Sequence, residues 1–287
     1  MINIMTFDIE EWYHSNLTDL KALAKFKIED RVVDLTLRIL DLLDETKNSA
    51  TFFVLGDVAE KFPELALEII NRGHEVGSHG YRHNLVYNYT KAQFEEDIRR
   101  SVDVLGKAIN RKILGYRAPS WSFNESTPWA WDVLNENGFQ YDSSMYPFKT
   151  FLYGCNESPM FKYKKELQNG STLTELPPSV IDFWGKRLPF SGGFFFRVSP
   201  LWYVNWCIRR INKLGNPAVI YLHPWEIDVE QPRVDVSAKD NFILYANLRK
   251  TEMKLRSLLK QHSFVSMKKY LSLDQQELSA KKETISS

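Results

Sequence analysis

The chain has 287 residues, of which 44% are hydrophobic and 25% are charged, and its formal net charge is +1. This composition is typical of a globular protein, and the length fits one large α/β domain or two small ones. The balanced charge gives no overall field that favours nucleic acid, and we expect none as a partner. Two distant cysteines, Cys155 and Cys207, exclude a disulfide framework and a CxxC metal site. We expect a cytoplasmic protein, because there is neither a leader-like start nor an apolar run long enough for a transmembrane segment.

Strand-like and helix-like segments alternate along the first half of the chain. Short β-branched or aromatic runs indicate strands, and apolar residues three or four apart indicate helices. Pro63 is tolerated only at a helix start or a break, and Thr90 is typical of a helix N-cap. The expected strands are 2–7, 50–55 and 73–78, and the expected helices are 30–45, 58–71 and 90–105.

The same alternation continues to residue 266. We expect strands at 115–121, 139–141, 173–181, 218–222 and 264–266, and helices at 126–137, 200–214 and 242–261. Strands separated by helices predict parallel βα units, and about seven such units predict a barrel whose catalytic residues gather at the carboxyl ends of the strands. The irregular segment 146–168 is expected to form a wall of the substrate cleft. We predict one domain over residues 1–273 and a disordered polar tail over 274–287.

Four residues at two expected strand ends have the chemistry of a metal site. His79 and His83 are four apart, so a helical turn would place both rings on one face. Asp8 and Glu10 alternate in an extended segment, so both point the same way. Two histidines and one carboxylate can hold a divalent metal and leave coordination positions open, which favours hydrolysis over a structural role. The second carboxylate is then free to act as a base, although charge alone does not say which of the two ligates.

Two further residues at strand ends fit acid–base chemistry. Arg117 could hold a carboxylate in a bidentate grip, and His223 has a reference pKa suited to a general acid. The tryptophans near these motifs suit either core packing or a sugar-binding cleft, and they are Trp12, Trp121, Trp184 and Trp225. The remaining histidines have no evident partner and are expected to be structural, namely His14, His74 and His262.

The motifs TFDIE (6–10), GSHGYRH (77–83), GYRAPSW (115–121) and YLHPWE (221–226) follow one another in the chain. In this order they resemble the polysaccharide deacetylases, the NodB-homology family also called carbohydrate esterase family 4. The resemblance covers roughly residues 1–230. It implies a deformed (β/α) barrel of about seven strands and metal-dependent N-deacetylation of acetylated amino sugars.

The resemblance also assigns roles by position. Asp8 matches the catalytic base, Arg117 the arginine that orients the base, and His223 the acid that protonates the leaving amine. His79 and His83 match the metal-binding histidines. The residues expected to contact substrate are Trp12, Pro119, Trp121 and Trp225.

The chain departs from the usual family pattern at the metal site. The family usually has two adjacent aspartates, whereas Ile9 stands at the second position and cannot ligate. Glu10 then becomes the third ligand, as in a branch that includes deacetylases of surface polysaccharide biosynthesis. That branch often has a Gly-Gly-aromatic-Phe-Arg stretch and a His-Pro-Trp-Glu ending, which are present here at 192–197 and 223–226. The family's fourth motif has only a loose counterpart at 182–184.

The resemblance implies a divalent metal and an acetylated substrate. Zn²⁺ is favoured by ligand type, and Fe, Co or Ni are alternatives. The substrate would be an acetylated amino sugar or its nucleotide- or lipid-linked precursor. Two other functions stay open: a metal-dependent amidohydrolase for a small non-sugar amide or imide, and a non-catalytic carbohydrate-binding protein. A narrow closed pocket would favour the small amide, and a long aromatic groove would favour the sugar.

Overall fold

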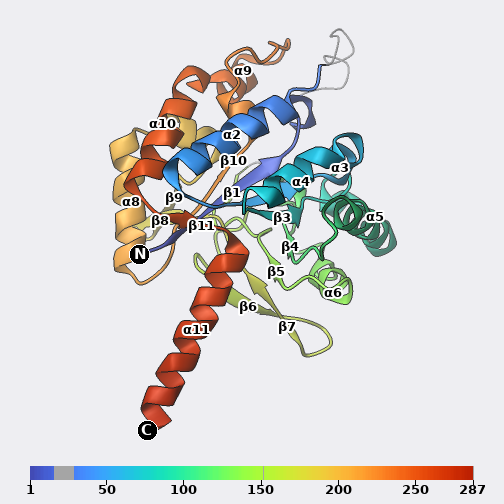
Figure 1. The fold of residues 1–287 in the computed structure, drawn as a ribbon, viewed down its shortest axis with the longest axis vertical. Coiled ribbons are helices and arrows are strands. Elements are labelled where there is room, and N and C mark those ends of the chain that lie inside the picture. The colour runs from blue at the N-terminus through green and yellow to red at the C-terminus, as the bar shows by residue number, and fades with distance from the viewer. Residues whose placement is uncertain (16–28, 151, 287) are drawn as a thin grey trace.

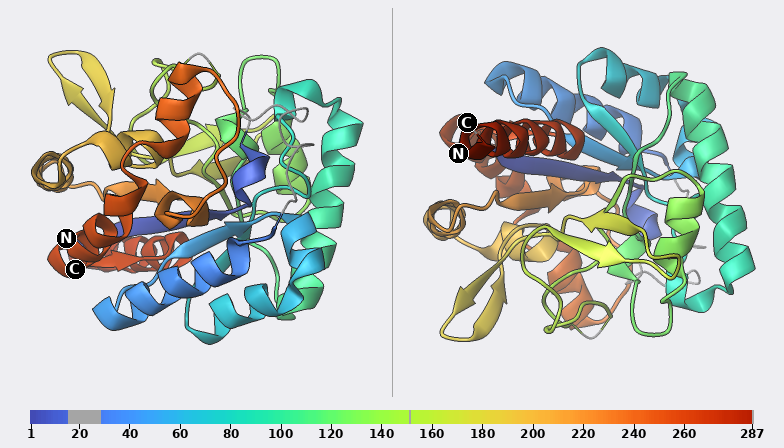
Figure 2. Two further views of the ribbon diagram at one scale, coloured as in Figure 1. Left: turned by 90° about the horizontal axis from the view of Figure 1, so that it is seen from above. Right: turned by 90° about the horizontal axis from the view of Figure 1, so that it is seen from below.

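A computed structural model describes residues 1–15, 29–150 and 152–286 (Figure 1). In this part of the chain seven neighbouring strands pair in parallel in the order β10-β1-β2-β3-β4-β5-β7, and β6 adds antiparallel to β7. No described pairing joins β10 to β6, so the curled sheet is an open, deformed barrel (Figure 2). This confirms the predicted fold class. The strands are β1 (Asn3–Ile9), β2 (Thr51–Val54), β3 (Glu75–Ser78), β4 (Gly115–Tyr116), β5 (Tyr141–Asp142), β6 (Tyr163–Glu166), β7 (Thr172–Glu175), β10 (Val219–Leu222) and β11 (Phe264–Val265), which pairs with the start of β1.

Helices cover the outside of the sheet (Figures 1 and 2). The longer ones are α2 (Val32–Thr46), α4 (Pro63–Asn71), α5 (Lys91–Ile109), α8 (Leu201–Lys213), α10 (Leu248–Gln261) and α11 (Met267–Ser286). The shorter helices are α3 (Gly56–Lys61), α6 (Ala130–Glu136), α7 (Gly193–Val198) and α9 (Ala238–Tyr245), with 3-10 turns η1 (Trp12–His14), η2 (Val86–Asn88), η3 (Pro119–Trp121) and η4 (Pro224–Ile227).

Two local predictions about helix ends are confirmed. The segment 58–71 is broken at Pro63, where α3 has ended and α4 begins, because proline lacks the N–H that a continuing helix needs. Thr90 caps α5 and forms a reciprocal capping box with Gln93.

Two predicted elements are each divided in the structure. The segment 173–181 forms β7 and β8 (Val180–Phe183) in different sheets, because Pro177 and Pro178 between them have no N–H for a ladder. The segment 242–261 is divided between α9 and α10 because Asn247 has a φ of 59°, in the left-handed region that interrupts an α-helix. Strand β9 (Lys186–Pro189) pairs with β8 in a hairpin outside the main sheet, which the sequence did not predict.

The last helix projects away from the rest of the molecule (Figure 1). The sequence predicted a disordered tail over 274–287, whereas α11 continues to Ser286, and Ser287 lies outside the described residues. The segment is rich in Gln, Glu, Lys and Ala, which are good helix formers. The single domain over 1–273 stays a prediction. None of the described helices combines the length and the apolar character needed to cross a membrane.

Candidate metal and catalytic site

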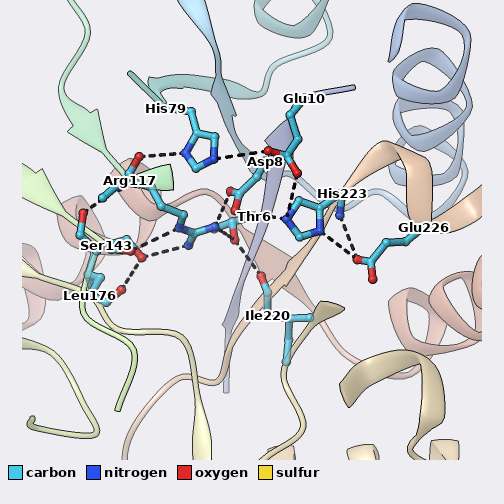
Figure 3. Close-up of polar contacts among 12 residues, drawn as sticks. Thr6, Asp8, Glu10, His79, Arg117, Ser143, Leu176, Ile220, His223 and Glu226 are labelled. Carbon is cyan, nitrogen blue, oxygen red and sulfur yellow. Dashed lines mark hydrogen bonds and ion pairs between the residues drawn. The ribbon is translucent and has the colours of Figure 1, made fainter. Parts of the chain in front are cut away.

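The site lies at the carboxyl ends of the parallel strands, where Figure 3 shows Asp8, Glu10, His79, Arg117 and His223 close together. Asp8 is the penultimate residue of β1, and Glu10 directly follows that strand. His79, Arg117 and His223 directly follow β3, β4 and β10. Because parallel strands end at the same edge, residues far apart in the sequence share one site, as the sequence predicted.

Arg117 fixes the carboxylate of Asp8. The Arg117 side chain is fully buried, and its Nη1 donates to Oδ1 of Asp8 at 2.7 Å and to Oγ1 of Thr6 at 2.9 Å. Its Nη2 donates instead to Oγ of Ser143 at 2.9 Å, so the predicted bidentate grip on the carboxylate is wrong. A buried cation bonded to one oxygen keeps Asp8 oriented and leaves Oδ2 available toward the cavity.

Glu10, His79 and His83 form a possible metal site. One ligand atom from each lies within 4.8 Å of the others. Oε2 of Glu10 is 2.7 Å from Nε2 of His83 and 4.0 Å from Nε2 of His79. This buried Oε2 has no other hydrogen-bond partner among the described residues. A carboxylate oxygen and two imidazole nitrogens that converge in this way fit a divalent cation.

The surroundings prepare His79 and Glu10 to ligate. Nδ1 of His79 lies 2.8 Å from the backbone oxygen of Arg117, so the tautomer with a proton on Nδ1 leaves Nε2 free. Burial lowers the pKa of His79 to about 4, which keeps the ring neutral. Burial alone would raise the pKa of Glu10, but His83, His223 and His79 outweigh it and hold this pKa well below its usual value. Trp225 fixes the other oxygen of Glu10 through an Nε1–H bond of 3.2 Å.

His223 is held by a buried ion pair that the sequence reasoning missed. Its Nδ1 lies 3.2 Å from Oε2 of Glu226, whose other oxygen accepts a 2.9 Å bond from Nε of Arg197. Nε2 of His223 faces the site, 3.9 Å from Oδ2 of Asp8. Burial alone would lower the pKa of His223, but the hydrogen bond with Glu226 and the nearby carboxylates raise it to about 9. The missed residues, Arg197 and Glu226, lie in the motifs at 192–197 and 223–226. The position of Glu226, three places after His223, was the signal that could have revealed it.

A cavity of about 130 Å³ opens beside these groups. Trp121 and Trp225 line it, as expected of residues that contact substrate. Trp12 and Pro119 are absent from its described lining; Trp12 instead packs in a buried cluster with Trp225. The substrate contacts of all four residues stay predictions. The loose fourth-motif counterpart at 182–184 lies on the β8–β9 hairpin, and no residue of it lines the cavity.

The cavity shares a wall with a larger hollow of about 670 Å³. Trp121, Leu152 and Tyr153 line both spaces, and two of these come from the irregular segment 146–168 that was predicted to form a wall of the cleft. Tyr87, Phe123 and Trp131 are among the residues that line the larger space. An aromatic groove therefore adjoins the site.

Of the three histidines expected to be structural, one lies beside the site. The ring of His14 stacks on His83 with centroids 6.2 Å apart and an interplanar angle of 9°. Its Nδ1 accepts a bond from the backbone N–H of Glu11, which occupies that nitrogen. His74 and His262 bond to Ala50 N and Asn205 respectively, away from the site.

Comparison with known families divides the chain into two matched regions. Residues 18–141 match the model of the family described as polysaccharide deacetylase. Residues 143–272 match a domain of unknown function, DUF3473. The two models therefore meet at β5.

Individual relatives agree with the first match. A peptidoglycan deacetylase of Helicobacter pylori is 35% identical over 108 residues, which are 38% of this chain and 36% of the relative, so the alignment spans about a third of that protein. A putative polysaccharide deacetylase structure from Mycobacterium smegmatis has a TM-score of 0.62 and 21% identity, with 97% of this chain and 90% of that one covered. A probable polysaccharide deacetylase structure from Pseudomonas aeruginosa PAO1 has a TM-score of 0.61 and 16% identity, with 92% and 86% covered.

The two structural likenesses extend over nearly the whole chain and support the deformed barrel fold. The matched family model covers the part of the chain that holds His79, His83 and Arg117. Residues 18–141 therefore resemble the polysaccharide deacetylase family in sequence, and nearly the whole chain resembles solved structures of that name in fold.

Proposed function

We propose that the protein is a metal-dependent N-deacetylase that removes the acetyl group of an acetylated amino sugar in surface polysaccharide biosynthesis. The observation that carries this proposal is the convergence of three ligand atoms of Glu10, His79 and His83 beside two differently held acid–base groups. Asp8 is held by a cation, and His223 is held by an anion. One site therefore has a base and an acid beside a potential metal.

Glu10, His79 and His83 would hold the metal. Glu10 takes the place that Ile9 cannot fill, and its buried Oε2 has no hydrogen-bond partner other than His83 among the described residues. When bound, a divalent ion would polarise the acetyl carbonyl and lower the pKa of water. Zinc suits two imidazoles and a carboxylate, and iron, cobalt and nickel accept the same ligands.

Asp8 and His223 would divide the proton transfers. Asp8 removes a proton from the attacking water through Oδ2, and Arg117 keeps its carboxylate ionised and oriented. His223 donates its Nε2 proton to the amide nitrogen as the C–N bond breaks, giving acetate and the free amine. Glu226 keeps His223 protonated before this step and orients the ring.

The groove favours an acetylated sugar over a small amide. The small cavity suits the acetamido group, and the adjoining aromatic space offers flat apolar rings to the neighbouring sugar units. The relative from Helicobacter pylori is named a peptidoglycan deacetylase, which supports a polymeric or precursor form of such a sugar. A nucleotide- or lipid-linked precursor in the cytoplasm is the form we propose.

Acetate release from acetylated amino-sugar polymers and precursors by the metal-reconstituted full chain tests the proposal. We expect release by the unaltered protein and none by Glu10→Gln. If a small cyclic imide is hydrolysed and every acetylated sugar is refused, the amidohydrolase alternative is supported instead. A protein that binds sugar but has no metal affinity would be a non-catalytic binding protein.

A further inference from the structure

The β8–β9 hairpin and helix α8 form an exposed aromatic surface outside the catalytic cavity. A hollow at their junction is lined by side chains from both elements: Ile181, Phe183, Leu188, Trp202, Tyr203 and Trp206. Trp184 at the hairpin tip is 91% exposed, and Trp202 at the start of α8 is 71% exposed. A group of large aromatic side chains this exposed to water marks a surface that binds another molecule.

Trp184 is held outward by a backbone that tryptophan seldom adopts. Its φ is 54° and that of Gly185 is 79°, so two successive turn residues have left-handed backbone. Such hairpin turns favour Asn-Gly, because a bulky side chain is strained at positive φ. Phe183 packs against Trp184 with ring centroids 4.8 Å apart, and both side chains are exposed. Neither packing nor backbone preference accounts for a tryptophan at this position.

Basic residues accompany the aromatic ones on α8. Positions 202, 206, 209, 210 and 213 recur at helical spacing, so one exposed face carries Trp202, Trp206, Arg209, Arg210 and Lys213. Over the hairpin and α8 there are five basic residues and one acidic residue. The acidic one, Asp182, accepts a bond from Gly185 N within the turn.

The basic side chains of this surface lack the acidic partners that others have. No described carboxylate lies within ion-pair distance of Lys186, Arg209, Arg210 or Lys213. Some exposed basic residues on other helices do have such partners, as Arg99 has Glu95 and Lys107 has Asp103. Arg187 is bonded to the backbone oxygens of Pro147 and Ser158, and the guanidinium of Arg210 lies over the ring of Trp206 at 5.7 Å from its centroid.

We infer that this aromatic-basic patch, formed by Phe183, Trp184, Lys186, Leu188, Trp202, Trp206, Arg209, Arg210 and Lys213, binds the surface of an anionic lipid bilayer. Tryptophan partitions to the headgroup boundary, where its apolar body is buried and its N–H stays hydrated. Exposed basic residues beside them, without carboxylate partners among the described residues, attract anionic headgroups. The inference does not depend on the proposed deacetylase activity.

Charge favours a bilayer over the other possible occupants. A second copy of the chain in a twofold dimer would bring the same cations of both subunits together without acids between them. A neutral sugar chain would use the aromatic rings and leave the four cations without a role. An anionic bilayer surface accounts for both the aromatic and the basic residues of the patch.

Sedimentation of the full chain with vesicles tests the inference. We expect binding to vesicles of phosphatidylcholine mixed with phosphatidylglycerol, weaker binding to phosphatidylcholine alone, and weakening by salt. Arg209→Glu with Arg210→Glu should reduce affinity for the anionic vesicles at least about tenfold. Trp184→Asn with Trp202→Ser should reduce the blue shift of tryptophan fluorescence on vesicle addition, since only Trp206 of the patch tryptophans remains, and asparagine accepts the positive φ of residue 184.

Matched controls lie on helices across the molecule from α8 (Figure 1). Arg99→Glu with Lys107→Glu on α5 makes the same charge change, and Leu67→Ser on α4 removes an exposed apolar side chain. Both controls should bind vesicles as the unaltered protein does, and all variants should keep its thermal unfolding temperature. Equal vesicle binding by the patch and control variants would overturn the inference. The inference would also be overturned if neither the unaltered protein nor any variant binds vesicles, and the patch variants instead dissociate a dimer or lose binding to an acidic polysaccharide.

Discussion

At the scale of single residues, Asp8 and Glu10 divide two tasks although they are almost adjacent in the chain. Asp8 is bonded to the buried guanidinium of Arg117, whereas Glu10 contacts His83 and Trp225. We expect Asp8→Asn to lower kcat by roughly 10²–10⁴-fold, because the amide cannot accept the proton. Bound metal should be unchanged, since Asp8 is outside the ligand set. Acetate release and metal content of the same preparation measure both quantities, and a variant with nearly normal turnover would contradict the role of Asp8.

Glu226 should control the pH range of activity through His223. The pKa of His223 is raised from 6.5 to about 9, so the ring is protonated below about 9 and acid catalysis is lost as the pH rises through that value. Glu226→Gln removes the hydrogen-bonded anion, and we expect the alkaline limb of kcat against pH to move down by at least about one unit. Glu230→Gln makes the same change at an exposed carboxylate and should leave the limb in place. A lower kcat with an unmoved limb would indicate a purely structural role for Glu226.

The raised pKa of His223 also makes the stability of the folded protein depend on pH. Because the folded-state pKa of His223 is above its unfolded value, its contribution is fully present below about pH 6.5 and is lost as the pH rises through about 9. Unfolding of the unaltered protein and Glu226→Gln should therefore differ most on the acidic side of this window. Urea unfolding at several pH values measures the difference.

The sequence could predict catalytic residues that end strands, but not their partners. His79, Arg117 and His223 combine a suitable chemistry with a position after an apolar run, and both are local features. The bond between Arg197 and Glu226 joins residues 29 apart on α7 and η4, so it depends on how these elements pack. The outward direction of Trp184 likewise follows from a hairpin that the sequence pattern did not reveal.

At the scale of elements, the sequence could predict a boundary where one residue and its neighbours determine it. Pro63 and Thr90 mark helix starts in both the sequence and the structure. The division of 242–261 at Asn247 could not be predicted, since asparagine is also compatible with a continuous helix. Strand β6 has alternating half-buried and exposed residues at the edge of the sheet, and its charged sequence gave no strand pattern.

Strands β4 and β5 pack closely because Gly115 of β4 has no side chain. A Cβ at Gly115 would lie 2.0 Å from the Tyr141 ring, and the two residues face each other in the β4–β5 pair. We expect Gly115→Ala to destabilise the protein by about 1–3 kcal/mol or more, because a packed ring must move. In α5, a Cβ at Gly106 would meet its nearest atom at an ordinary 3.5 Å. Gly106→Ala should therefore stabilise by about 0.5–1 kcal/mol, and urea unfolding of the pair checks the opposite signs.

At the scale of the whole molecule, the barrel brings distant parts of the chain together at the site. Phe7 of β1 is in register with Leu222 of β10, and this pairing sets Asp8 beside His223 although 215 residues separate them. The family model over 18–141 contains His79, His83 and Arg117, whereas His223 and Glu226 lie in the region matched by the second model. The site is complete only when both regions fold against β1.

This dependence makes metal binding a measure of global folding. A metal that binds the folded chain through Glu10, His79 and His83 should stabilise it by about 2.7 kcal/mol at a free concentration one hundred times Kd, because the unfolded chain lacks the assembled site. We expect zinc to raise the thermal unfolding temperature of the unaltered protein and of Asp8→Asn alike, and a chelator to reverse the rise. Glu10→Gln should lose most of this rise, whereas Glu166→Gln at an exposed position of β6 should keep it. A rise of the same size in Glu10→Gln and in the unaltered protein would mean that Glu10 does not replace the aspartate that Ile9 displaces.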